Sequence, residues 1–319
     1  MKLKSPMFNE KVVITQLNNK FAIDLTNDNI LTNSGVLKHG LTYKILQAIK
    51  LIPPSTKLVL YHTEKRQAIG FLSLEENTDW LYSIKYVFVD PNYRKMGLAT
   101  RLLNYAMILA KEKGAKKVNL NVYSTDIKTI NLYKKLGFKK YGTTLLGQGS
   151  IPEFALFRLI KQATVGVSNL SKLTSINQGK LFNLKMNARK NREIIYNIYQ
   201  LCLDKKWIDF FEINANNLQN GSRHVWRPIF FKDVVINNSA NAFALIFNNP
   251  FLQKANVEVY SISDYLSLSI LEHLLEILKN RGISFTQITL FNIGNSVTLN
   301  WFQKKGMRTF EFTSMGKTL

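Results

Sequence analysis

The stretch V-D-P-N-Y-R-K-M-G-L-A, from Val89 to Ala99, predicts the end of a β-strand, a turn and the start of a helix. The first turn of a helix leaves backbone N–H groups without partners and carries the positive end of the helix dipole, so phosphate binds there without dedicated side chains. Gly97 lets an anion approach the backbone closely, and Ala99 is small enough not to block it. Since Arg94 and Lys95 add positive charge, the stretch predicts a phosphate-binding turn.

The elements that follow the turn have a definite order and spacing. A helix from about Gly97 to Lys113 ends before a buried strand at Val118 to Val122, and the segment N-L-Y-K-K-L-G-F follows at 131–138. This arrangement resembles the GCN5-related N-acetyltransferases, the GNAT superfamily. The R/Q-x-x-G-x-G/A turn of that family is matched at 94–99 and its L-Y-x-x-x-G-F segment at 132–138, so the resemblance directly covers about the first 160 residues.

The resemblance implies the GNAT fold, a mixed α/β sheet with helices on both faces, and a site for acetyl-CoA as co-substrate. Two central strands of this fold splay apart, and the pantetheine arm of acetyl-CoA enters the gap and pairs with the first of them. The strand, the turn and the later helix would then supply the cofactor-binding residues Val87, Phe88, Val89, Arg94, Lys95, Met96, Gly97, Leu98, Ala99, Thr100 and Asn131.

Tyr133 is the candidate general acid that the resemblance implies. A phenol with a pKa near 10 can hydrogen-bond to sulfur and donate a proton as the thiolate leaves. The competing interpretation is an aromatic side chain that packs on the edge of the sheet. Asp126 departs from the family pattern, because many members carry Asn at this position to contact the cofactor, so no role is assigned to it.

The general base is not determined by the sequence, since family members often use a Glu on a central strand or only a chain of waters. Glu75, Glu76 and Asp79 lie near a predicted hairpin turn, where solvated carboxylates are the competing interpretation. Tyr82 and Tyr86 alternate on the strand that leads to the cofactor. They either line the acceptor site or pack in the core.

The first half reads as a mixed α/β domain. Apolar runs and alternation predict strands, polar stretches with Gly or Pro predict turns, and a helical crossover predicts a parallel pair. The predicted strands are Val12 to Thr15, Leu58 to His62, Ala68 to Leu74, Leu81 to Val89, Val118 to Val122 and, after the Gly-rich stretch 142–149, Glu153 to Leu159. Two further segments, Asp24 to Lys38 and His39 to Lys50, read as helices or as helix and loop.

The length of 319 residues favours two domains. We expect a catalytic domain at 1–162, a polar linker at 163–180 and a second GNAT-like domain at 181–319. The order of the first half returns in the second. Its predicted helices are Arg189 to Lys205 and Tyr265 to Lys279, and its predicted strands are Ile229 to Ile236, Ala242 to Phe247, Val257 to Ile262 and Ile288 to Phe291.

A shift of 169 positions supports the repeat, because it places 126–138 over 295–307 without a gap and with four identities in thirteen. The candidate cofactor-binding and catalytic residues are not repeated. Tyr133 falls on Phe302, and aligning the glycines at 114 and 282 places Gly97 on Tyr265, where a side chain should obstruct a phosphate. The same alignment places Arg94 on Ile262 and Ala99 on Ser267. The second domain is therefore expected to lack an intact cofactor motif.

The composition, with 46% hydrophobic and 20% charged residues, is that of an ordinary globular protein. The start of the chain lacks the apolar core of a secretory signal, and no stretch of about 18 uncharged apolar residues could span a bilayer, so a cytoplasmic location without a membrane partner is expected. The single cysteine, Cys202, excludes an internal disulfide and sits in an apolar helical pattern typical of a buried thiol. The four histidines lack metal-ligand spacing, so no metal is expected.

The formal net charge of +22 is spread over both halves, with 25 Lys or Arg against 11 Asp or Glu at 1–162 and 18 against 10 thereafter. Such a charge suits phosphates, nucleic acids or an RNA-linked acceptor, although the codon usage of a low-GC genome is an equally simple source. The oligomeric state is left open.

The expected function is acetyl transfer to a primary amine by direct attack in a ternary complex, with an active N-terminal domain and a C-terminal lid, scaffold or wall. The alternative is an acetyl-CoA-binding sensor or nucleic-acid-binding module that uses the basic surface. The acceptor cannot be deduced from these residues. Antibiotic, polyamine, amino acid, peptide N-terminus and protein lysine all remain candidates.

Overall fold

The computed structural model describes residues 11–16, 54–150, 182–184, 189–214, 216, 232–236, 242–249, 254–261, 264–280, 282–291 and 296–319. The N-terminal half, up to Ser150, contains β1 (Val12–Gln16), β2 (Ser55–His62), β3 (Gln67–Glu76), β4 (Leu81–Val89), the 3-10 turn η1 (Pro91–Tyr93), α4 (Leu98–Glu112), β5 (Lys117–Tyr123), α5 (Ile127–Lys135) and β6 (Lys139–Ser150).

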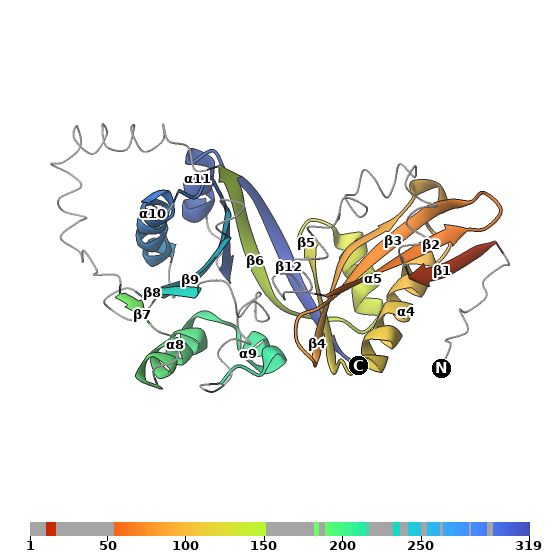
Figure 1. Ribbon diagram of the computed structural model, residues 1–319, viewed down its shortest axis with the longest axis horizontal. Helices are drawn as coiled ribbons and strands as arrows, with labels where there is room; N and C mark the ends of the chain where they lie inside the picture. Colours follow the sequence, from red (N-terminus) through yellow and green to blue (C-terminus); the bar gives the residue numbers. More distant parts are fainter. Residues whose placement is uncertain are drawn as a thin grey trace.

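The C-terminal half repeats this order. It contains β7 (Phe182–Leu184), α8 (Arg189–Cys202), α9 (Lys205–Phe211), β8 (Lys232–Ile236), β9 (Ala242–Asn249), β10 (Lys254–Ser261), α10 (Asp264–Asn280), β11 (Phe285–Phe291), α11 (Ser296–Lys304) and β12 (Arg308–Thr318). Figure 1 shows the two halves as two lobes, with β6 and β12 running between them.

The described strands form one continuous sheet in the order β1-β2-β3-β4-β5-β12-β6-β11-β10-β9-β8-β7. The last strand of each half lies inside the other half. β12 separates β5 from β6, with Ser314 opposite Asn121, and β6 separates β12 from β11, with Leu145 opposite Leu290. Each half therefore completes its sheet with a strand from the other half.

The N-terminal sheet has two chemically different faces, because side chains alternate along a strand. One face packs against α4 and α5 in a buried apolar core, in which Leu60, Tyr82 and Leu120 take part. We call the other side the polar face. It carries residues on alternate positions of β3, β4, β5 and β12, namely Ser73, Glu75, Ser83, Lys85, Asn119, Asn121 and Ser314.

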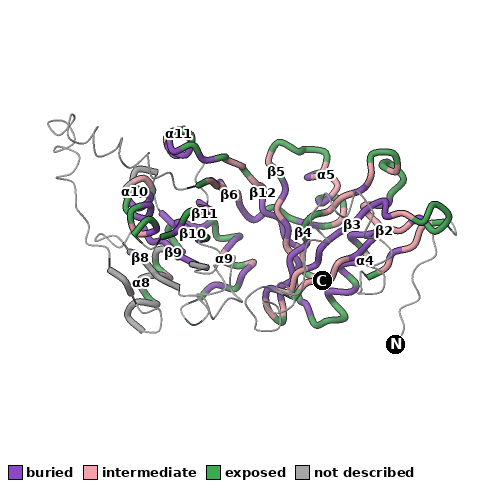
Figure 2. Tube along the Cα trace, turned by 45° about the horizontal axis from the view of Figure 1, so that its top comes forward, coloured by how far each residue is buried: buried purple, intermediate pink, exposed green. Residues whose placement is uncertain are grey.

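A buried, mainly apolar cluster packs on each face of the C-terminal sheet. α10 and α11 cover one face, where Val257, Leu274 and Leu290 are buried. On the other face a mainly aromatic cluster packs under α8 and α9, and it extends to Leu81 and Tyr141 of the N-terminal half. Figure 2 shows buried residues, in purple, along the central strands of both halves.

Most predicted strands and helices of the described regions are confirmed within a few residues, including the crossover helix α4 and the parallel pair β4 and β5. No strand was predicted for the Gly-rich stretch 142–149, but it forms the body of β6. The reason is packing: the ring of Phe302 covers Gly147, and a Cβ atom there would overlap that ring.

Four predictions fall on residues outside the described part of the chain. They are the helices at Asp24 to Lys38 and His39 to Lys50, the strand at Glu153 to Leu159 and the linker at 163–180. The domain boundaries that depend on this linker stay predictions.

Candidate active site at the fork of β4 and β5

The predicted phosphate-binding turn has the backbone geometry that its sequence indicates. Gly97 begins α4 with a φ of 75°, a left-handed conformation that favours glycine, and the first helical hydrogen bond runs from Arg101 N to Gly97 O at 3.1 Å. The amides of 98–100 precede this bond and so need other partners. A Cβ atom on Gly97 would meet nothing within 4 Å, so the space beside this glycine is open.

Side chains of the turn hold its shape. Asp90 accepts a hydrogen bond from the backbone N–H of Asn92 at 2.8 Å, and Arg94 Nε donates to the carbonyl oxygen of Val89 at 2.9 Å. Arg94 and Lys95 are exposed. Arg94 therefore both fixes the turn and places positive charge beside the open amides.

Two central strands diverge in front of this turn, as the family resemblance predicts. β4 and β5 pair in parallel only from Leu81 opposite Lys117 to Ser83 opposite Asn119, although both strands continue. Beyond that point the strands part, and we call this place the fork. The predicted cofactor residues of 87–89 lie on the arm of β4 that has left β5.

A β-bulge accompanies the divergence. Phe71 stands opposite Phe88 and Ser73 opposite Lys85, so two residues of β4 face one residue of β3. Tyr86, within the bulge, has a φ of 55° and is 65% exposed. Bulges bend a strand and increase its twist, which gives a local physical reason for β4 to leave β5.

Tyr133 lies on α5, buried in the core of the α4 face with 5% of its surface exposed. Its ring contacts Phe138, with the two centroids 5.8 Å apart. Burial, together with the charge of Asp126, raises the pKa of Tyr133 to about 12. The phenol therefore keeps its proton at neutral pH, as a general acid must, and it also packs as the competing interpretation requires.

Asp126 has a structural role. Its carboxylate caps α5 by accepting hydrogen bonds from Thr129 N at 3.0 Å and Thr129 Oγ1 at 2.7 Å, and these bonds lower its pKa. Helix capping thus gives this acid a role that requires no contact with a cofactor. Asn131, on the same helix, is exposed.

The two tyrosines of β4 lie in different environments. Tyr82 is 3% exposed and packs in the apolar core, where burial and a hydrogen bond with Glu76 raise its pKa. The packing interpretation is therefore the correct one for Tyr82. Tyr86 projects from the bulge.

Sequence reasoning missed a polar network at the base of the fork. Asn77 Nδ2 donates to Ser83 Oγ, Ser83 Oγ donates to Asn119 Oδ1 at 2.5 Å, and Ser314 Oγ donates to Asn121 Oδ1 at 2.6 Å. The signal was the alternation V-N-L-N-V at 118–122, which puts two amides on the face opposite the core. The contribution of Ser314 had no signal in the N-terminal sequence.

Among the three carboxylates near the hairpin, Glu75 is not a solvated turn residue. It lies on β3 directly opposite Ser83, its side chain is 13% exposed, and its Oε2 is 2.5 Å from Lys85 Nζ. On the same face, Lys57 Nζ donates to Ser73 Oγ at 2.7 Å, and burial lowers the pKa of this lysine.

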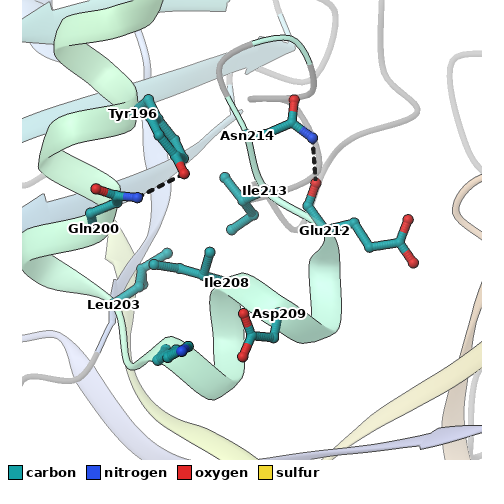
Figure 3. A pocket seen from close by; sticks show the side chains of 9 residues that line it. Tyr196, Gln200, Leu203, Ile208, Asp209, Glu212, Ile213 and Asn214 are labelled. Atoms are coloured by element: carbon teal, nitrogen blue, oxygen red, sulfur yellow. Dashed lines mark hydrogen bonds between the residues drawn. The ribbon is translucent and has the colours of Figure 1, made fainter.

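A cavity also lies elsewhere in the described part of the chain, between α8 and α9 (Figure 3). This open groove of about 650 Å³ is lined by side chains that include Tyr196, Gln200, Asp209 and Glu212. All the predicted cofactor residues lie on β4, on the turn that follows it, on α4 and on α5, so the groove does not belong to the predicted site. The fork is the candidate because its open amides and unpaired strand edge fit an elongated phosphate ligand.

Among the described residues, neither Cys202 nor a metal-binding cluster suggests a second reaction centre. Cys202 is buried, as predicted, and burial raises the pKa of its thiol to about 12. Within the described ranges, no group of His, Cys, Asp and Glu side chains is arranged to hold a metal ion. None of the described helices combines the length and the apolar character needed to span a membrane.

Comparison with known proteins gives concordant results. Residues 23–138 match the model of the acetyltransferase (GNAT) family. An uncharacterized N-acetyltransferase of Methanocaldococcus jannaschii is 34% identical over 80 residues, which cover 23% of this chain and 34% of that protein. The match therefore spans about a third of the length of this curated relative.

A solved structure matches almost the whole chain. A GCN5-related N-acetyltransferase from Sphaerobacter thermophilus aligns with 98% of this chain and 97% of its own, with a TM-score of 0.54 and 10% sequence identity. At this identity the likeness concerns the fold alone. It includes both halves.

Proposed function

Because residues 23–138 match the acetyltransferase (GNAT) family, we propose that the chain is an acetyl-CoA-dependent N-acetyltransferase whose N-terminal half carries the reaction. The observation that supports this most directly is the fork of β4 and β5, which opens toward the unpaired amides at the start of α4. A primary amine would attack the acetyl group directly in a ternary complex.

The residues of the fork suit the parts of acetyl-CoA. The amides of 97–100, with Arg94 and Lys95 beside them, fit its diphosphate. The free edge of β4 at 87–89 fits the amide groups of pantetheine, which pair as a strand does. Bound there, acetyl-CoA supplies the activated acyl group, and the chain supplies orientation and proton transfer.

Tyr133 is the proposed general acid. Its high pKa keeps the phenol protonated, so it can donate to the departing sulfur. On the polar face, Glu75 is in register with Ser83 and offers a carboxylate for the proton that the amine loses. Its ion pair with Lys85 fixes the position of this carboxylate, and a water molecule would carry the proton to it.

The C-terminal half is proposed to bind no acetyl-CoA of its own. β10 pairs with β11 from Lys254 opposite Phe285 to Val259 opposite Leu290, so no fork forms within these pairs. The connection from β10 to α10 consists of residues 262–263, whereas residues 90–97 connect β4 to α4. The C-terminal half therefore has fewer residues between this strand and this helix than the N-terminal half has.

Ligand-dependent stability tests this proposal. Millimolar acetyl-CoA should raise the melting temperature of the wild type, because a ligand that binds the folded state stabilises it. Gly97→Tyr should abolish the shift by filling the open space and straining a positive φ. Gly282→Tyr is a matched control, since Gly282 also has a positive φ, of 68°, and open space around it, but ends α10. A wild type that does not respond would contradict the proposal.

The sensor or nucleic-acid interpretation of the charge of +22 makes a different prediction. Phosphate contacts release counterions, so the logarithm of a nucleic-acid affinity should fall linearly with the logarithm of salt concentration. Weak binding to a duplex RNA that does not saturate would indicate that the charge belongs to a Lys-rich surface without a nucleic-acid site. Binding of acetyl-CoA without transfer to any amine would favour the sensor.

A further inference from the structure

The architecture of the fork determines the side from which an amine arrives, and this inference rests on the proposed function. On one side of β4 and β5 the α4 core is filled by Ile84, Val118 and Val122, among other buried residues. A polar amine cannot reach a carbonyl group through this packed apolar layer. It must approach across the polar face, where Ser83 and Asn119 mark the base of the fork.

Asn121 is the first polar-face residue on the arm of β5 beyond this base. It stands two positions after Asn119, so its side chain leaves the strand on the same face. The two amides differ in their partners. Asn119 Oδ1 accepts a hydrogen bond from Ser83, and Asn119 Nδ2 donates one to Tyr141 OH at 3.5 Å, so both polar atoms of this carboxamide have partners.

Of the two polar atoms in the Asn121 carboxamide, only the oxygen is hydrogen-bonded among the described residues. Its Oδ1 accepts the hydroxyl of Ser314 at 2.6 Å, while its Nδ2 makes no hydrogen bond within the part of the chain that the structure describes. Ser314 is fully buried and belongs to β12, which the C-terminal half inserts beside β5. The hydroxyl determines the orientation of the carboxamide, because only its oxygen can accept the proton of Ser314.

We propose that Asn121 binds the amine substrate beside the reacting carbonyl group, and that Ser314 of the C-terminal half is the positioning residue that orients it. Nδ2 is a donor, so the ligand that it fits is a primary amine with a carbonyl, carboxylate or hydroxyl oxygen next to the amino group. The C-terminal half thus contributes to the site through a strand and needs no acetyl-CoA site of its own.

A double-mutant cycle tests the positioning role. Acetyl transfer is measured for glycyl-glycine, L-lysine, kanamycin and spermidine, of which spermidine alone lacks oxygen. Ser314→Ala should raise the KM of the fastest acceptor about fivefold at nearly constant kcat, as expected for one lost hydrogen bond. Asn121→Ala should raise it at least as much, and the double variant no further, because Ser314 acts through Asn121.

The controls and contrary outcomes are specific. Thr313→Val removes a hydrogen bond of 3.1 Å between Thr313 and Ser124, at the neighbouring position of β12, and should leave the KM unchanged. Additive effects of Ser314→Ala and Asn121→Ala would refute the positioning role. Spermidine as the best acceptor, with a KM insensitive to Asn121→Ala, would refute the substrate class.

Covalent labelling tests the location of Asn121 without any acceptor. In Asn121→Cys, the thiolate should attack the CH₂ group of bromoacetyl-CoA, form a C–S bond and release bromide, its proton having gone to solvent. Thr289→Cys is the matched control, because the shift of 168 residues that aligns Gly114 with Gly282 places position 121 on 289, in the half whose strands stay paired.

Mass spectrometry should show labelling at position 121 about tenfold or more faster than at 289, with suppression by excess acetyl-CoA. The buried Cys202 should stay unmodified in the wild type. Absence of labelling at 121 in a variant that still binds acetyl-CoA would overturn the inference. Absence of acetyl-CoA binding in the wild type would instead overturn the proposed function.

Discussion

The two halves of this chain share their construction in detail. Adding 169 to the bounds of α5, Ile127–Lys135, gives those of α11, Ser296–Lys304, and the same shift takes the start of β6 to the start of β12. Pairs of glycines also correspond. Gly114 and Gly282, and Gly137 and Gly306, have positive φ angles. The two halves therefore end their corresponding helices with the same backbone conformations.

The halves differ where the N-terminal half would hold a ligand. β4 leaves β5 after Ser83, whereas β10 stays paired with β11 as far as Val259. The residues of the C-terminal half that succeed these positions are aromatic: the ring of Tyr260 stacks on Phe291, with centroids 4.5 Å apart. The comparison shows how a fold can keep its core while closing the one gap that the proposed reaction needs.

Among the changes that test this comparison, separating the two halves should have the largest effect, a loss of folding. A fragment of residues 1–162 leaves β5 and β6 without β12 between them, and a fragment of residues 181–319 leaves β12 and β11 without β6. Each fragment should lose its cooperative folding, about 5–15 kcal/mol for a domain of this size. Circular dichroism with thermal melting measures this, and co-expression should restore one soluble complex. A fragment 1–162 that melts cooperatively by itself would show that the exchanged strand is dispensable.

Tyr133→Phe should have the next largest effect, and on turnover rather than folding. Loss of a general acid should lower kcat about a hundredfold, while the thermal shift with acetyl-CoA should stay as in the wild type. The free energy of unfolding should change by less than about 1 kcal/mol, because only one hydroxyl is removed. Equal turnover in steady-state assays of the two proteins would leave Tyr133 with its packing role alone.

The reciprocal change, Phe302→Tyr, places the missing hydroxyl in the C-terminal half. Phe302 is fully buried beneath its contact with Gly147, so the new hydroxyl should lack a partner and cost about 1–3 kcal/mol in urea denaturation. The variant should bind no additional acetyl-CoA, because the paired strands leave no gap. A second binding event in titration calorimetry would show that the two halves differ less than their strand pairing indicates.

The smallest expected effect concerns pH. Folding raises the pKa of Tyr133 from 10.0 to about 12, so the neutral phenol is favoured in the folded state. The resulting stabilisation is fully present below pH 10 and disappears as the pH rises through 12. The wild type should therefore lose about 1–2 kcal/mol more than Tyr133→Phe over this interval. Urea titrations at a series of alkaline pH values measure the difference, and parallel losses would contradict the assigned burial of this phenol.

The local features of the site could be predicted because they depend on a few consecutive residues. The helix start at Gly97 requires a positive φ and open amides, and the strand 118–122 shows its buried face in its alternation. The polar role of that alternation was overlooked, since the amides of Asn119 and Asn121 acquire meaning only from Ser83 and Ser314. Likewise, Glu75 was placed at a turn because its partner Lys85 lies on the next strand.

The sequence by itself determined the phosphate-binding turn, the order of strands and helices in each half and the repetition of that order, since these depend on contacts within a few residues or one crossover. The tertiary structure alone decided which strand stands beside β5. β6 and β12 are the corresponding last strands of the two halves, so their local sequences do not say which of them stands beside β5. The free energy of completing one continuous sheet selects β12, and Ser314 reaches Asn121 across 193 positions of the chain for that reason.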